Sequence, residues 1–191
     1  MKLKMTALAT SILALGLMGA SYTASAADYV IDSKGMHASI KFRVQHLGYS
    51  WLYGQFNEFD GTYSYDKDAP EKTAVAVNIK TSSVDSNHAE RDKHLRSDDF
   101  LDVEKFPEAK FVSTSYDGSI LKGDLTLHGV TKPIEIAVEK VGEGDDPWGG
   151  YRSGFEGKTS FKMADFGITK DLGPKSTDVE MILSIEGVKQ K

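Results

Sequence analysis

Alternation of apolar and polar residues dominates the chain after residue 26. From His37 to Gln45, every second residue is apolar. The same period recurs in residues 75–80, 121–128, 134–139, 155–161 and 179–186. A two-residue period is typical of a β-strand that buries one face, so the pattern predicts a chain made mainly of half-buried strands.

Further strands are predicted at Tyr29–Ser33, Trp51–Phe59, Thr62–Tyr65 and Ala109–Tyr116, which brings the total to about eight to ten. Turn signals lie at Asp60-Gly61, Asp117-Gly118, His128-Gly129 and Asp145-Asp146-Pro147. Short strands in series with tight turns predict an all-β fold, either an antiparallel sandwich or a barrel. One helix is expected, over residues 88–97, with Asn87 as its N-cap.

The first 26 residues read as a cleaved signal peptide. Lys2 and Lys4 precede an uncharged apolar run from Met5 to Ala20, which is shorter than the roughly 20 residues that span a bilayer. Ala24-Ser25-Ala26 then matches a signal peptidase site. We therefore expect cleavage after Ala26, export to the periplasm, and a single domain over residues 27–191.

Composition excludes several classes of function. The chain has no cysteine, which rules out disulfides, thiol catalysis and cysteine-held metal centres. Without Lys2 and Lys4 the chain carries 21 basic and 28 acidic side chains, a net charge of −7. An acidic chain without a basic run is a poor candidate for nucleic-acid binding or for loose attachment to anionic lipid.

The densest group of ionisable residues lies on the predicted helix, from His88 to His94. The two histidines are six positions apart, so their side chains do not converge on one ion as an i, i+4 pair would. We expect no metal site and no other cofactor. The chain also lacks a Gly-x-Ser-x-Gly elbow and a glycine-rich phosphate loop, and we assign no catalytic residue.

The alternation does not decide whether the predicted barrel is filled or hollow, because the sequences of both kinds of barrel alternate in the same way. Small residues on inward faces favour a hollow interior, because they would leave room between bulkier neighbours. They are Ala38, Gly123, Gly157 and Thr159. The aromatic segment from Tyr49 to Phe59 has three alternatives: core packing, a partner surface or the wall of a cavity.

Several segments of the chain resemble the YceI-like family of secreted bacterial proteins. They are Ala27–Asp32, Phe42–Gly54, Phe59–Thr62, Ser83–Ser97, Gly123–Pro133, Asp146–Gly149 and Asp165–Ile168. The resemblance implies an eight-stranded antiparallel lipocalin-like β-barrel with a helix beside it. It also implies an interior cavity for a polyisoprenoid or a related amphiphile, and it supplies no catalytic residue.

On this basis we expect one set of residues to line the ligand: Phe42, Val44, Trp51, Tyr53, Phe56, Val77, Ile79, Leu125, Leu127, Phe155, Phe161 and Met181. A polar head group would need a few donors at the mouth of the barrel. The candidates for that role are Arg43, His46, His88, Arg91 and Trp148.

Three functions remain open at this point. The first is a periplasmic carrier that binds a long apolar lipid without turnover and without stable membrane insertion. The second is an enzyme that modifies such a lipid with His88 and Glu90 as acid and base, and the third is a stress-related structural protein with a packed barrel. An edge strand or the aromatic segment near Trp51 would allow a homodimer.

Overall fold

The computed structural model describes residues 26–35 and 37–191. Apart from Ala26, the predicted signal peptide lies outside the described residues. No helix within those residues is long and apolar enough to cross a membrane.

The described residues form one antiparallel sheet of eleven strands with a single α-helix. The strands are β1 (Ala27–Ile31), β2 (Ser39–His46), β3 (Ser50–Phe56), β4 (Phe59–Tyr65), β5 (Ala74–Lys80), β6 (Val84–Asp85), β7 (Glu108–Tyr116), β8 (Ile120–Leu127), β9 (Val130–Asp145), β10 (Tyr151–Lys162) and β11 (Asp178–Lys189). The helices are α1 (Ala89–Arg96) and the short 3₁₀ turns η1 (Pro70–Lys72), η2 (Thr81–Ser83) and η3 (Met163–Phe166).

Eight of these strands close into a barrel in the order β1-β4-β5-β7-β8-β9-β10-β11, with β11 returning to β1. The predicted eight-stranded antiparallel barrel is therefore confirmed. Strand β11 pairs with β10 along one edge and changes partner along the other, where residues Glu180–Ser184 pair with β2 and Gly187–Lys189 pair with β1. The β2–β3 hairpin extends the wall beyond this change of partner and carries β6 at its edge.

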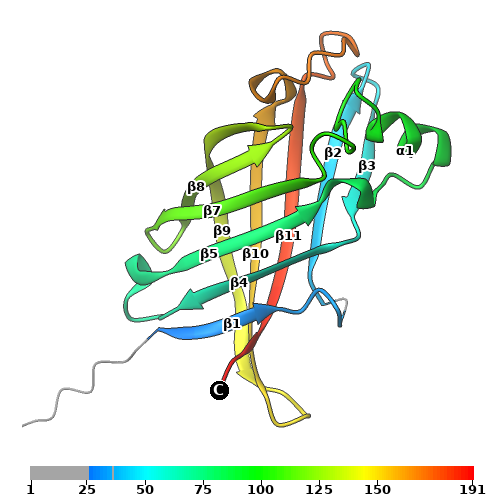
Figure 1. The fold of residues 1–191 in the computed structure, drawn as a ribbon. Coiled ribbons are helices and arrows are strands. Elements are labelled where there is room, and N and C mark those ends of the chain that lie inside the picture. Colours follow the sequence, from blue (N-terminus) through cyan, green and yellow to red (C-terminus); the bar gives the residue numbers. More distant parts are fainter. Residues whose placement is uncertain (1–25, 36) are drawn as a thin grey trace, which may run out of the picture.

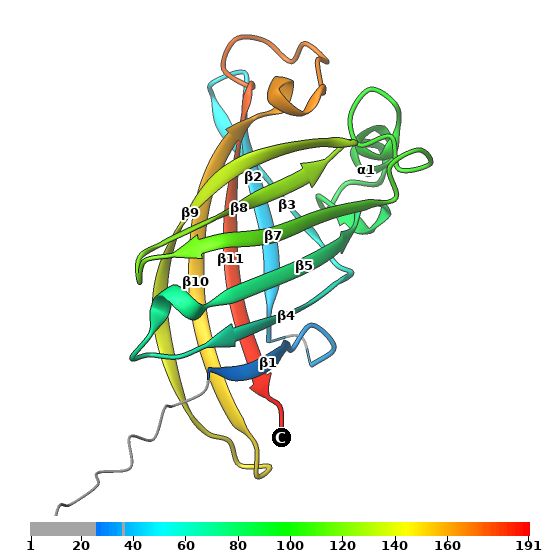
Figure 2. The same ribbon diagram turned by 60° about the vertical axis from the view of Figure 1, so that its left-hand side comes forward.

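The two ends of the barrel differ. Helix α1 and the connection between β10 and β11 lie at one end, which we call the α1 end (Figure 1). The β9–β10 hairpin and β1 lie at the opposite end, which we call the far end, and the second view shows the same arrangement (Figure 2).

Three of the four predicted turns are confirmed. Asp117-Gly118 joins β7 to β8, His128-Gly129 joins β8 to β9, and the Asp145–Pro147 segment begins the β9–β10 hairpin. Asp60-Gly61 is wrong as a turn, because both residues lie within β4 and pair with β5. A side chain at position 61 would meet the Ala76 carbonyl oxygen at 2.6 Å, so glycine permits this close approach of two strands.

The predicted strand Trp51–Phe59 is divided between β3 and β4. The chain turns away between them because the backbone N–H of Asn57 donates to the Ser83 carbonyl and that of Glu58 donates to the Ser83 hydroxyl. These bonds replace strand pairing at residues 57 and 58. Helix α1 is confirmed, but His88 rather than Asn87 is its N-cap.

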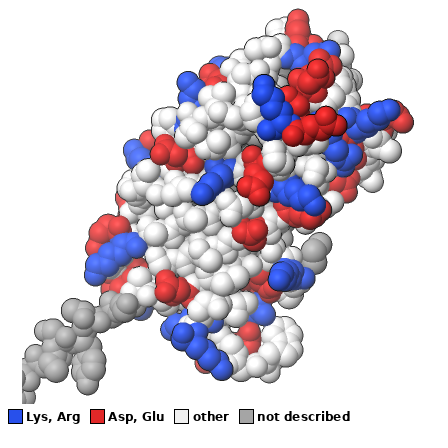
Figure 3. Space-filling model, in the orientation of Figure 1, with Lys and Arg blue, Asp and Glu red and all other residues white. Residues whose placement is uncertain are grey.

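The outer wall carries mixed charges. Cross-strand pairs such as Lys122–Glu135 at 2.7 Å and Lys80–Glu58 at 2.9 Å lie on exposed faces of the sheet. Basic and acidic side chains are intermingled on the face shown in Figure 3. The excess of acidic residues is therefore spread over the surface instead of forming one patch on this face.

Candidate ligand-binding cavity

The barrel encloses a cavity of about 730 Å³, within the usual range of small-molecule sites. All eight strands of the closed barrel except β1 contribute several inward-facing residues, and β2 and β3 complete the wall. The lining is overwhelmingly aliphatic and aromatic. The structure therefore does not show the filled barrel that the sequence allowed as an alternative.

Eleven of the twelve residues expected to line the ligand border this cavity. They are Phe42, Val44, Tyr53, Phe56, Val77, Ile79, Leu125, Leu127, Phe155, Phe161 and Met181. Their contact with a ligand stays a prediction, because the structure contains none.

Trp51 is the exception and does not border the cavity. It lies opposite Gln45 in the β2–β3 pairing, and the Arg43 guanidinium stacks over its ring at 4.0 Å. Arg43 also donates to the Glu180 carboxylate at 2.6 Å. Arg43 lies between the cavity residues Phe42 and Val44, and successive residues of a strand point to opposite faces, so Arg43 and the ring beneath it belong to the outer wall. Tyr53 borders the cavity although it lies opposite Arg43 and is 55% exposed.

The inward-facing glycines do not all leave space. A Cβ at Gly123 would lie 2.4 Å from the Phe111 ring, and one at Gly54 would lie 2.3 Å from the Phe42 ring. These rings cover the glycines and form part of the cavity wall. The expectation that Gly123 leaves room is wrong for this reason. Gly157 does border the cavity, whereas Ala38 is buried away from it.

Polar residues gather where the cavity reaches the α1 end. Arg91 of α1 borders the cavity, donating from Nε to the Ser86 hydroxyl at 2.7 Å and from Nη2 to the Ser86 carbonyl at 2.6 Å. Ser86 in turn donates its N–H to the Asp92 carboxylate at 2.7 Å. Burial opposes ionisation of Asp92, but the hydrogen bonds from Ser86 outweigh it, and the pKa of Asp92 lies below its ordinary value. Arg91 is thus held in place by a buried acceptor.

One carboxylate joins two segments at this end of the cavity. Asp99 Oδ2 lies 2.7 Å from His94 Nε2 of α1 and 2.7 Å from Lys170 Nζ in the β10–β11 connection. The hydrogen bond from Lys170, and to a smaller extent the one from His94, lowers the pKa of Asp99. His94 and Leu172 border the cavity, so this contact, which we call the Asp99 junction, links two parts of its rim.

The five head-group candidates separate into two groups. His46 and Arg91 border the cavity. Arg43 lies on the outer wall, and His88 caps α1 by accepting the Arg91 N–H at its Nδ1. Trp148 is 76% exposed on the β9–β10 hairpin, at the far end. The structure therefore does not bring Arg43, His88 and Trp148 to the cavity.

Several cavity residues were not anticipated from the sequence. They are Tyr63 and Tyr65 on β4, and Ser86, His94, Phe100 and Leu172 at the α1 end. The alternation of Tyr63 and Tyr65 within a predicted strand was the available signal for the first two. The other four lie on loops and on the helix, where no local pattern indicates a cavity.

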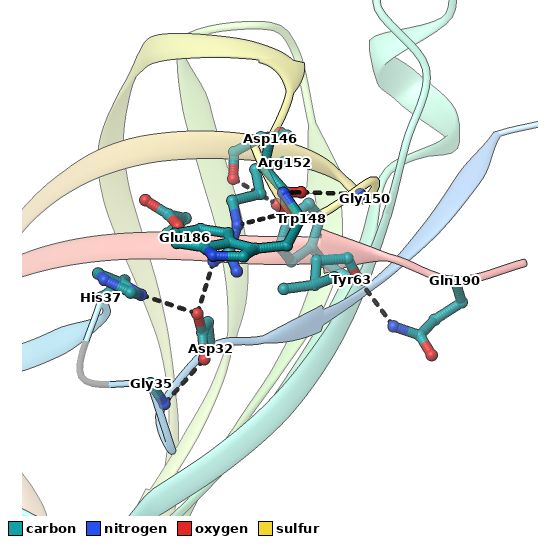
Figure 4. A network of polar contacts seen from close by, with 12 residues as sticks. Asp32, Gly35, His37, Tyr63, Asp146, Trp148, Gly150, Arg152, Glu186 and Gln190 are labelled. Carbon is teal, nitrogen blue, oxygen red and sulfur yellow. Dashed lines mark hydrogen bonds and ion pairs between the residues drawn. The ribbon is translucent and has the colours of Figure 1, made fainter.

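A cluster of charges lies outside the far end of the barrel. Figure 4 shows Arg152 among Asp32, Asp146 and Glu186, with the Trp148 ring beside it. Arg152 Nη1 lies 2.6 Å from Asp32 and 2.6 Å from Glu186, and Nε lies 2.9 Å from Asp146. Hydrogen bonds from Arg152 and then His37 lower the pKa of Asp32 to about 2.

This cluster of charges lies where strands β1, β10 and β11 meet. Asp32 follows β1 and Glu186 lies on β11 beside the point where that strand changes partner. Asp32, His37 and Glu186 also offer three atoms within 4.8 Å of one another. Arg152 already supplies a positive charge to both carboxylates, so the cluster stabilises the seam between β1, β10 and β11.

Comparisons with known proteins extend over nearly the whole chain. The UPF0312 protein of Azotobacter vinelandii is 59% identical over 185 residues, covering 93% of this chain and 96% of that protein. The UPF0312 protein of Shewanella denitrificans is 60% identical over 183 residues, covering 91% and 96%.

Solved structures share the fold. The Campylobacter jejuni YceI protein superposes with a TM-score of 0.69 at 27% identity, covering 78% of this chain and 91% of that one. BcnA of Burkholderia cenocepacia gives a TM-score of 0.72 at 18% identity, covering 82% and 98%. A polyisoprenoid binding domain from Saccharophagus degradans gives 0.63 at 15% identity, covering 87% and 100%. The model of the YceI-like domain matches residues 29–187, and the chain belongs to the YceI-like family.

Proposed function

We propose that this protein binds one long apolar lipid of the polyisoprenoid type inside its barrel and carries it through the periplasm without chemical change. The observation that carries the proposal is the cavity of about 730 Å³ with its apolar wall. A space of this kind, left unfilled by the protein's own side chains, is what an apolar ligand needs.

The energetics favour a chain-like ligand. Removing apolar carbon from water contributes roughly 0.8 kcal/mol per CH₂, so each five-carbon unit offers a few kcal/mol before ordering costs. No polar contact is required along the chain, which matches a wall composed of residues such as Val77, Leu125 and Ile136. The affinity should therefore depend on the length of the chain and on its fit to the wall.

We place the polar end of the ligand at the α1 end of the cavity. His46, Arg91 and His94 border the cavity there, next to the Asp99 junction. His46 and Arg91 offer N–H donors to a hydroxyl, carbonyl or anionic head group, and His94, whose Nε2 pairs with Asp99, offers its Nδ1. His46 and Arg91 keep the role expected from the sequence, and His94 joins them.

The comparisons support the proposal at two levels. Membership of the YceI-like family supports a binding barrel. The Saccharophagus degradans domain is described as polyisoprenoid binding, and at 15% identity its likeness supports the shared barrel rather than the ligand. The choice of an isoprenoid therefore rests on the resemblance to the YceI-like family, and the apolar cavity supports a lipid ligand.

The proposal includes no turnover. His88, one of the two acid/base groups in the enzymatic alternative, points its Nδ1 at the Arg91 N–H as the N-cap of α1. It does not border the cavity, and Glu90 does not either. A lipid held in the barrel would thus lie away from both groups that the alternative requires.

The decisive test is the content of the purified protein. The chain is expressed with residues 1–26 intact, recovered from the periplasmic fraction and extracted with organic solvent for mass spectrometry. We expect an N-terminus at Ala27 and a copurifying apolar lipid. Delipidated protein should then bind isoprenoid alcohols in a fluorescent-probe displacement assay. Absence of any bound lipid, together with no binding of added isoprenoids, would refute the proposal.

A further inference from the structure

Three aromatic rings line the cavity toward the far end of the barrel. Tyr63 and Tyr65 come from β4 and Phe155 comes from β10, and all three border the cavity. The Phe155 ring meets Tyr63 edge-on at 5.7 Å and Tyr65 edge-on at 5.1 Å. We call these three residues the aromatic floor.

Tyr63 is held from several sides. Its ring stacks on Tyr29 of β1 with 4.8 Å between centroids, and its hydroxyl donates to the Ser153 carbonyl at 2.9 Å. A Cβ at Gly187 would lie only 2.5 Å from the ring, so glycine at that position lets the ring lie flat against β11. Only 5% of Tyr63 is exposed. A ligand would have to break these contacts to move the ring.

Tyr65 is supported by charge on its other side. Lys140 of β9 lies opposite Phe155 in the β9–β10 pairing, and its Nζ lies 4.4 Å from the centre of the Tyr65 ring. The same ammonium pairs with Glu143 at 2.7 Å, and both side chains are 26% exposed. Neither borders the cavity. The apolar space therefore ends at the rings, with an ion pair directly behind them.

We propose that the aromatic floor determines the longest isoprenoid chain that the barrel accepts. This inference rests on the proposed function, and it assigns a specificity role to Tyr63, Tyr65 and Phe155. A chain that enters from the α1 end gains contacts with each added unit until it reaches the floor. A further unit would have to displace fixed rings and approach the Lys140–Glu143 pair, or remain in water at the mouth, so it adds no affinity.

The test measures affinity against chain length in the full mature protein. Delipidated protein is titrated with isoprenoid alcohols from farnesol to solanesol, with displacement of a fluorescent apolar probe as the readout. For the wild type, we expect affinity to rise with each unit and then to level off at one length.

Two variants should move this limit in opposite directions. Tyr65→Ala removes one ring of the floor, so the first alcohol beyond the wild-type limit should bind about tenfold more tightly than it does to the wild type. Val75→Phe adds a ring at a cavity residue that lies opposite Tyr63, so the limit should fall to a shorter alcohol. Leu172→Ala, at the mouth, is the matched control and should leave the limit in place.

The outcomes are distinguishable. Opposite shifts in Tyr65→Ala and Val75→Phe support the floor as the determinant of length, and Val75→Phe alone still tests it if Tyr65→Ala does not fold. A limit at the same alcohol in every folded variant, or affinity that rises without limit in the wild type, overturns the inference while the proposed function stands. If no alcohol binds the wild type, the proposed function fails and the inference fails with it.

Discussion

A leucine in place of Gly157 should weaken ligand binding and stabilise the empty protein at the same time. Gly157 lies on β10 between Val138 of β9 and Leu183 of β11, and it borders the cavity. A Cβ there would lie 3.1 Å from Ile136 Cγ2 and 3.2 Å from Leu183 Cδ1. Both contacts are side-chain methyl groups and not backbone atoms, so movements of a few tenths of an ångström admit the Cβ, and the rest of the leucine extends toward the cavity.

The two effects follow from the same carbon atoms. The leucine side chain occupies about the space of one isoprene unit, whose burial is worth roughly 3 kcal/mol before ordering costs. We expect affinity for long isoprenoid alcohols to fall roughly ten- to hundredfold. The empty protein should gain about 1 kcal/mol, because the leucine buries apolar surface and glycine is a poor strand residue. That corresponds to a melting temperature higher by about 2–4 °C.

Two glycine variants complete the experiment, which combines probe displacement with thermal unfolding of delipidated protein. Gly157→Ala reports the backbone contribution alone and should leave affinity close to the wild type. Gly123→Leu is the matched control, because the Phe111 ring already covers that glycine at 2.4 Å and the variant must lose stability. If Gly157→Leu were destabilised by the roughly 1–3 kcal/mol typical of an overpacked core, the interior would be filled and our reasoning refuted.

Three further predictions concern the ends of the barrel. Arg152→Met should lose about 2 kcal/mol of unfolding free energy at neutral pH, because Asp32 has a folded pKa of about 2. This stabilisation is present above the ordinary carboxyl pKa and is lost as the pH falls through about 2. The unfolding free energies of variant and wild type in urea titrations should therefore converge near that pH. Asp99→Asn opens the Asp99 junction and should speed probe dissociation several-fold in stopped-flow measurements, while the melting temperature changes little. An unchanged dissociation rate would argue against a rim contact that controls ligand exchange. Tyr49 is 86% exposed on the β2–β3 hairpin, beside the cavity residue Leu47. Tyr49→Ser should slow the transfer of a bound alcohol to lipid vesicles but leave the affinity for that alcohol unchanged. Equal transfer rates in variant and wild type would count against contact of this hairpin with the membrane.

The barrel could be predicted because alternation is a local property of each strand. The face that each residue occupies could be predicted only where one parity is clearly apolar, as in β2. In β3 both parities carry apolar or aromatic residues, Trp51 and Tyr53 on one and Leu52 and Phe56 on the other. Their assignment depends on the register with β2, a contact between strands that the local pattern does not encode.

The cavity itself could not be read from the pattern. Gly123 and Gly157 occupy equivalent inward positions in their strands and look alike in the sequence. They differ because the Phe111 ring from a neighbouring strand would lie 2.4 Å from a Cβ at Gly123, whereas the nearest side-chain atoms of Ile136 and Leu183 would lie 3.1 Å and 3.2 Å from a Cβ at Gly157. Three head-group candidates failed for a related reason, since the sequence does not say which end of the barrel carries the polar lining residues. Trp148 lies on the β9–β10 hairpin at the far end, whereas Arg91 and His94 border the cavity beside α1.

A hollow barrel without disulfides needs other sources of stability, and the structure places them around the cavity instead of inside it. At the α1 end, Val84 and Phe166 are each 1% exposed and belong to the hydrophobic core, and the Phe166 ring meets Phe161 edge-on at 5.0 Å. At the far end, the Tyr29–Tyr63 stack lies inside the wall and the Arg152 cluster lies outside it. Between the two ends, lining residues such as Val77, Leu125 and Ile136 are buried and belong to the hydrophobic core. A substitution that shortens one of them should therefore change ligand affinity and also cost stability, whereas filling the space beside Gly157 changes affinity without removing a core contact.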